Sequence, residues 1–198
     1  MRLWISLAIL LLGAPSVAAA EDRCGTYPDA VFDQADAGWG DCLLHDLGEA
    51  PLWHGLEPNL RQHIRFTFTE GHGLWTRVVN IIEYADGGAR VSLRSVLTGP
   101  RDHKRQLPPQ SATVTAAQIA TLNQLAEQSG VWKFDVGSWN NPKDLVIHCE
   151  MLDMERANAD GYRFSTVWIS CSKPAKLVPL VTFVAQLAGL HEMPDGRY

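Results

Sequence analysis

The first twenty residues decide the conditions under which this chain folds. Met1 and Arg2 give a short positive start, and residues 3–12 form an apolar run too short to cross a bilayer comfortably. Three alanines at 18–20 follow, small residues of the kind that precede a signal-peptidase site. The pattern predicts a secretory signal peptide that is cleaved after Ala20. We therefore expect a soluble protein, secreted or periplasmic, with no membrane anchor after cleavage.

All four cysteines lie beyond this leader, and an even number of cysteines in an oxidising compartment predicts two disulfides. Residues 145–155 and 162–171 have the pattern of two strands around a short turn. A hairpin centred on Asp160 would place the last two cysteines opposite each other, and the first two would then close a short N-terminal loop. The predicted disulfides are therefore Cys24–Cys42 and Cys149–Cys171.

The composition, with 46 % apolar and 20 % charged residues, is that of an ordinary globular domain. Residues 21–62 are rich in Gly, Pro, Asp and Trp, which predicts loops that pack over a core and are stapled by the first disulfide. Residues 63–198 carry the strand and helix patterns. We expect the two parts to form one domain over 21–198, because no linker separates them.

Hydrophobic periodicity predicts the elements of this domain. Ile64, Phe66 and Phe68 alternate with polar residues, which is typical of a strand with one buried face. Residues 75–84 and 89–97 predict two further strands, and the three together read as an antiparallel meander.

Two helices follow from terminal signals. Thr115 and Gln118 form a capping box, and Gly130 stands where a C-terminal cap belongs. A last apolar stripe begins after Pro174, with Pro179 in its first turn. The order β-β-β-α-β-β-α predicts an α+β fold. It would have an antiparallel sheet of about five strands, two helices on one face and a disulfide-stapled N-terminal loop region.

Charge and motifs exclude several functions. The formal net charge is −5, and the one basic cluster, at 101–105, lies between Gly-Pro and Pro-Pro and is best interpreted as a solvated loop. Nucleic-acid binding is therefore not expected. The chain has no nucleophile elbow, no phosphate-binding loop, no Cys-x-x-Cys and no His-Glu-x-x-His. We accordingly expect no metal and no cofactor.

Two clusters are catalytic candidates. Glu70 and His72 alternate with glycines after a predicted strand, where they could act as base and acid, although a turn is the simpler interpretation. His148 and Glu150 occupy alternate positions of a predicted strand near Asp144 and would share a face, and a solvated strand face is the simpler interpretation there.

Trp39 and Trp139 have Gly, Asp or Asn neighbours, which makes them weak candidates for a binding surface. Packing against the core is the simpler role for each. With no catalytic motif, the sequence favours a non-catalytic binding module, such as an inhibitor, an immunity-like protein or an envelope accessory protein, with a protein or envelope partner. The alternative is a small cell-envelope hydrolase that uses a Glu/His acid–base pair.

Overall fold

The computed structural model describes residues 23–35, 37–98, 104–141, 143, 148–172 and 174–190. The predicted leader, Asp144 and the first part of the basic cluster lie outside these residues. Within them, an α+β fold surrounds one mixed sheet, and no helix is long and apolar enough to span a membrane.

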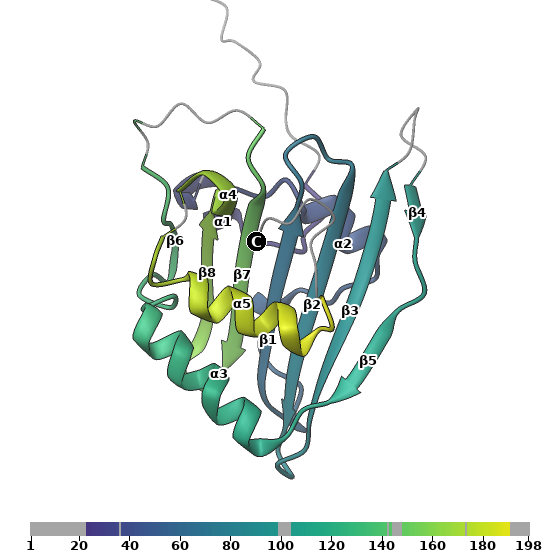
Figure 1. Ribbon diagram of the computed structural model, residues 1–198, viewed down its shortest axis with the longest axis vertical. Coiled ribbons are helices and arrows are strands. Elements are labelled where there is room, and N and C mark those ends of the chain that lie inside the picture. Colours follow the sequence, from purple (N-terminus) through teal and green to yellow (C-terminus); the bar gives the residue numbers. More distant parts are fainter. Residues whose placement is uncertain are drawn as a thin grey trace, which may run out of the picture.

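The sheet has eight strands among the described residues, in the order β4-β3-β2-β1-β7-β8-β6, with β5 also paired to β3 (Figure 1). All pairs are antiparallel except β6 with β8. The strands are β1 (Leu60–Thr69), β2 (Trp75–Tyr84), β3 (Ala89–Thr98), β4 (Lys104–Gln106), β5 (Gln110–Thr113), β6 (Val136–Ser138), β7 (Met151–Asn158) and β8 (Gly161–Val167).

The prediction of about five strands is wrong in number and in its purely antiparallel pairing. The three missed strands β4, β5 and β6 have three or four residues each, too few to show a period. Both β4 and β5 are exposed throughout, so that their sequences have no apolar alternation. The last basic residues of the 101–105 cluster belong to the edge strand β4 rather than to a loop.

Helices cover one face of the sheet and the N-terminal segment covers the other (Figure 1). The helical layer is α3 (Ala116–Ser129) and α5 (Val178–Leu187), with the short α4 (Ile169–Ser172) after β8. The N-terminal layer, predicted as loops, contains α1 (Asp29–Ala35), α2 (Asp41–Asp46) and the 3-10 turn η1 (Leu52–His54).

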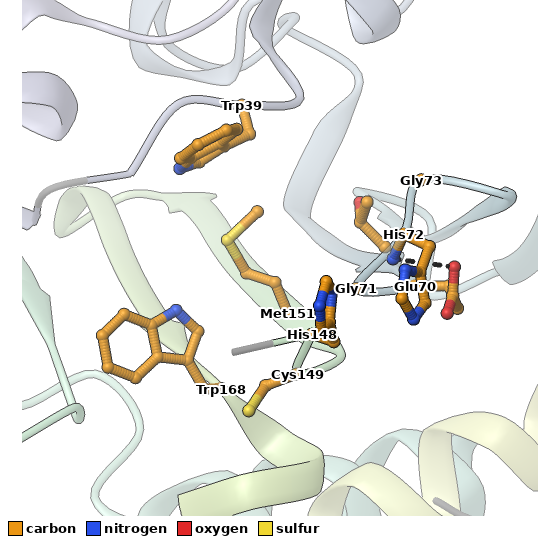
Figure 2. A pocket seen from close by; sticks show the side chains of 10 residues that line it. Trp39, Glu70, Gly71, His72, Gly73, His148, Cys149, Met151 and Trp168 are labelled. Atoms are coloured by element: carbon orange, nitrogen blue, oxygen red, sulfur yellow. Dashed lines mark hydrogen bonds between the residues drawn. The ribbon is translucent and has the colours of Figure 1, made fainter. Parts of the chain in front are cut away.

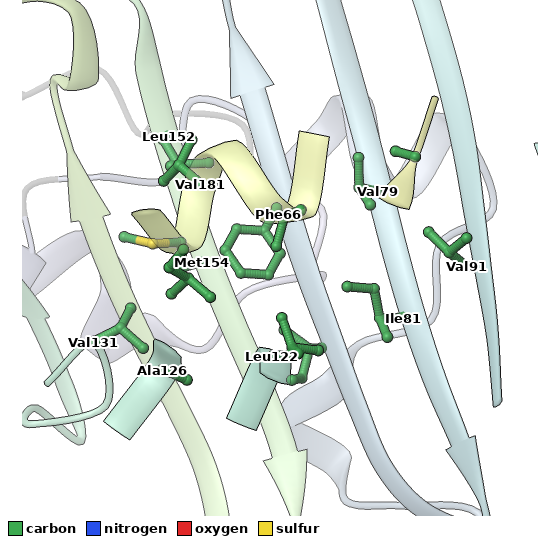
Figure 3. Close-up of a cluster of buried hydrophobic side chains, with 14 of the residues drawn as sticks. Phe66, Val79, Ile81, Val91, Leu122, Ala126, Val131, Leu152, Met154 and Val181 are labelled. Carbon is green, nitrogen blue, oxygen red and sulfur yellow. The ribbon is translucent and has the colours of Figure 1, made fainter. Parts of the chain in front are cut away.

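The signals that predicted α3 and α5 are confirmed. Thr115 and Gln118 form the capping box, and Gly130 ends α3 with φ of 67°, a left-handed conformation that glycine adopts readily. Pro179 lies in the first turn of α5. Between these helices and the sheet lies the larger apolar core, in which strand residues such as Phe66 face Leu122 of α3 (Figure 3).

The opposite face of the sheet is also buried, which the alternation in β1 did not predict. The N-terminal layer covers it with a smaller apolar cluster that includes Val31 and Leu44. As a result, the polar positions Arg65 and Thr67 are only 0 % and 2 % exposed. A strand with one solvated face and a strand with a polar but covered face have the same sequence period.

Both predicted disulfides, Cys24–Cys42 and Cys149–Cys171, are confirmed. The hairpin that suggested the second one is shorter than predicted and shifted by one residue, since Asn158 pairs with Gly161 and the pairing ends at Leu152 and Val167. This bridge therefore does not cross two paired strands. It ties the segment just before β7 to α4, which follows β8.

Candidate functional site

A pocket of about 480 Å³ lies beside the Cys149–Cys171 disulfide, where segments distant in sequence meet (Figure 2). They are the turn before α2, the β1–β2 loop, the segment leading into β7 and the β8–α4 junction. Four of the six residues singled out from the sequence line it. The lining residues are Trp39, Thr69, Glu70, Gly71, His72, Gly73, His148, Cys149, Met151 and Trp168.

Glu70 shapes the β1–β2 loop with its own carboxylate. Its Oε2 atom accepts hydrogen bonds from the backbone N–H groups of His72 at 2.9 Å and Leu74 at 3.2 Å. Its backbone carbonyl accepts a further hydrogen bond from the N–H of Gly73 at 2.7 Å. A carboxylate that accepts two backbone donors fixes the loop, and this loop in turn presents His72 to the pocket.

The β1–β2 loop lies directly against the backbone of the segment before β7. A Cβ atom at Gly71 would overlap the carbonyl group of His148, so only glycine allows this approach. His148 itself has φ of 60°, which is uncommon outside glycine and stores some backbone strain. The Cys149–Cys171 disulfide anchors the same segment to α4. The close approach of the two loops therefore depends on a glycine, and the disulfide fixes the second loop to α4.

This contact brings two imidazoles together at the surface. The rings of His72 and His148 stack with their centroids 4.1 Å apart and their planes 17° from parallel. Both residues are exposed, and no side-chain hydrogen bond joins either imidazole to another residue whose position is described. Their ring nitrogens are therefore available to a ligand.

Aromatic and thioether groups form the other wall of the pocket (Figure 2). Trp39 is 82 % exposed, an unusual position for so large an apolar side chain. Trp168 leaves the end of β8, where its backbone N–H donates to Oδ1 of Asn140 at 2.7 Å. The side chain of Met151 lies between these indoles and the imidazoles. Sequence reasoning missed both residues. Met151 begins β7 and Trp168 follows β8, so each resembles a core residue at the end of a strand.

The other two candidates lie outside this lining. Glu150 is buried, and its backbone N–H donates to Oγ of Ser170 at 2.7 Å. The prediction that His148 and Glu150 share a strand face is wrong, because β7 begins only at Met151. Trp139 packs edge-on to Phe134 with the Nζ atom of Lys133 3.6 Å from its ring centroid.

The largest pKa shifts belong to a buried ionic network under the N-terminal layer, not to the pocket. The Arg65 guanidinium contacts Glu155 at 3.1 Å and Glu49 at 3.3 Å. Burial lowers the pKa of Arg65, but these carboxylates outweigh burial and raise it. Burial also raises the pKa of Glu155, which the charge of Arg65 offsets only in part.

Two other groups on this face of the sheet have pKa values shifted in opposite directions. Burial raises the pKa of Asp153 to about 7, against the hydrogen bond that it accepts from Thr166 at 2.7 Å. Burial lowers the pKa of His63 to about 4, although its hydrogen bond with Asn80 at 2.9 Å works the other way. None of these groups lines the pocket, so we assign the network to stability rather than to ligand binding.

The chain matches no protein-family model and no curated protein.

Proposed function

We propose that this protein is an exported, non-catalytic binding module that holds a small ligand in the pocket between Trp39, Trp168, Met151 and the His72–His148 pair. The observation that carries the proposal is the convergence of these residues from four separate segments on one pocket. Backbone contact at Gly71 and a disulfide hold the segments in place, and such pre-organisation lowers the cost of binding.

The lining chemistry indicates the kind of ligand. A volume of about 480 Å³ is in the range of small-molecule sites. Among the described residues, the lining contains no Lys or Arg, and the one carboxylate, that of Glu70, accepts hydrogen bonds from backbone N–H groups. The described lining therefore offers an anionic ligand no Lys or Arg as a partner. The pocket suits a neutral or positively charged ligand with an apolar face for the indoles and a polar edge for the imidazoles.

The same geometry gives less support to a Glu/His hydrolase. Acid–base catalysis needs the two groups within hydrogen-bond reach of the proton that they transfer. The side-chain hydrogen bonds described for Glu70 go to backbone N–H groups of its own loop. Glu150 lies outside the lining of the pocket.

A ligand screen on tryptophan variants tests the proposal. Neutral and cationic small molecules would be screened for those that raise the melting temperature of the wild-type protein. We expect Trp39→Ala and Trp168→Ala to abolish the shift. Trp53→Ala is the matched control, since Trp53 is 40 % exposed and lies in η1, outside the pocket.

Two outcomes would contradict this proposal. One is a set of stabilising compounds that act equally on all three variants. The other is turnover of a cell-envelope glycan or peptide by the wild type that disappears in Glu70→Gln, which would favour the hydrolase instead.

A further inference from the structure

We infer that the His72–His148 pair is a binding site for one copper(I) ion, coordinated by one imidazole nitrogen from each loop. This inference rests on the proposed binding function of the pocket and assigns a metal to its polar wall. Met151 lines the same pocket and is the additional soft donor.

The two rings are close enough to share a metal ion after a small rearrangement. Their centroids are 4.1 Å apart and their planes 17° from parallel, so in this arrangement their nitrogens do not point at a common position. Nitrogens that bind one ion at about 2.0–2.1 Å place the ring centroids about 5–6 Å apart. Rotation about both the Cα–Cβ and the Cβ–Cγ bonds of each side chain separates the rings by this amount and turns a nitrogen of each towards the ion. Both side chains are exposed, so the core does not obstruct this rotation.

The donor set selects the metal. Calcium and magnesium require several oxygen ligands, and the carboxylate of Glu70 is committed to its loop. A structural zinc site needs four ligands, and the nearest cysteine, Cys149, is bonded to Cys171. Copper(I) accepts two or three ligands and favours nitrogen and thioether sulfur over oxygen. Two imidazoles with a methionine alongside match that preference.

The described part of the chain has one group of three or more His, Cys, Asp or Glu side chains with the spacing of metal ligands. It consists of Cys24, Asp41 and Cys42, and its two cysteines form a disulfide. Asp41 accepts hydrogen bonds from the backbone N–H groups of Cys24 and Tyr27. That group therefore serves the N-terminal fold, and the paired imidazoles are the better metal site.

The surroundings of the pair favour a bound cation. Gly71 allows the two loops to come into contact, and the Cys149–Cys171 bridge fixes the His148 segment to α4, so that little ordering is needed on binding. The indoles of Trp39 and Trp168 line the same pocket, and a cation near the face of an indole is attracted by its electrons.

Titration with copper(I) tests the inference on the mature, disulfide-bonded protein. The measurement uses a competing chromogenic copper(I) chelator, anaerobically and with a non-thiol reductant that leaves both disulfides intact. We expect one equivalent to bind. Loss of either ligand should weaken binding by more than about 100-fold, because changes outside the first shell alone cost about 10–100-fold. The ligand variants are His72→Ala and His148→Asn, since Asn tolerates the positive φ of His148.

The control variants are His45→Ala and His54→Ala, which remove exposed imidazoles outside the pocket and should leave the affinity unchanged. Circular dichroism and the melting temperature would verify that each variant is folded. The inference is overturned if copper(I) does not bind stoichiometrically, or if both ligand variants bind it like the wild type. Equal or tighter binding of zinc(II) with the same histidine dependence would overturn the assignment to copper.

The copper site and the pocket can fail separately. If copper(I) does not bind but a small molecule still stabilises the protein in a Trp39- and Trp168-dependent way, the metal inference is wrong and the binding proposal stands. If no ligand of either kind depends on these residues, both are wrong.

Discussion

Both faces of the central sheet are covered, but the two covering layers depend on different interactions. Neighbouring residues of β1 show the contrast, because Phe66 and Arg65 are both 0 % exposed. Phe66 enters the apolar core beneath α3 and α5. Arg65 enters an ionic network beneath the N-terminal layer, where it also donates from Nη2 to the carbonyl of Ala50 at 2.8 Å.

This difference separates stability from specificity. Apolar burial under the helices is favourable in many packing arrangements and has no dependence on pH. Buried charges are favourable only when each has its partner in place, because desolvation is costly. The contacts of Arg65 with Glu49 and Ala50 therefore fix the position of the N-terminal layer. They also make the stability of the fold sensitive to substitution and to pH.

Removal of the central charge should have the largest effect. Arg65→Met leaves Glu155 buried without its cation and leaves Glu49 with Arg94 as its remaining cation, and we expect a loss of about 3–5 kcal/mol in the free energy of unfolding. Arg61→Met, which removes an exposed partner of Glu83, should cost about 0–1 kcal/mol. Denaturant unfolding measures both.

A double variant sharpens this result. Arg65→Met combined with Glu155→Gln should recover part of the stability, because a neutral amide then replaces the carboxylate that has lost its cation. If Arg65→Met alone stays within about 1 kcal/mol of the wild type, the network does not hold the N-terminal layer as we describe.

The ionic face should also make stability depend on pH through Asp153. Its folded pKa of about 7 lies above the ordinary value of 3.8. Between these two pH values the native state therefore holds a proton that the unfolded chain has lost. The stabilising contribution is complete below about pH 4 and is lost as the pH rises through 7, by up to about 1.4 kcal/mol per pH unit.

Comparison with Asp153→Asn isolates this contribution. Unfolding free energies at several pH values should show the variant gaining on the wild type between pH 4 and 7, and then no further. His63, whose folded pKa of about 4 gives the opposite slope over part of this range, is present in both proteins and cancels. A difference that does not change with pH would refute the account, and Asp33→Asn in α1 provides an exposed control.

The smallest effect is expected on the helical face, at the start of α3. Thr115→Ala removes the hydroxyl that accepts the N–H of Gln118, and such caps contribute about 1 kcal/mol. Thr121→Ala, in the middle of the same helix, should change stability much less, since its hydroxyl donates to a carbonyl already within the helix. Equal losses would mean that the cap is not what stabilises this end of α3.

The candidate site was only partly accessible to sequence reasoning. Glu70, His72, His148 and Trp39 stood out as separate weak signals because glycines and polar neighbours surround them. Nothing local could show that His72 would stack on His148, since the two lie on loops joined only by tertiary contacts. The predicted alignment of His148 with Glu150 on one strand face is wrong, because β7 begins after both residues.

What the sequence by itself determined is the set of features that depend on neighbours along the chain. These include the capped start of α3 at Thr115, its glycine end and the long strands β1 to β3. Periodicity and capping act over one or two turns, so they are legible locally. Only the tertiary structure decided that Arg65 is buried and that two imidazoles meet. Both depend on which distant segment covers a surface. Packing and the pairing of charges between segments far apart in the sequence determine that arrangement.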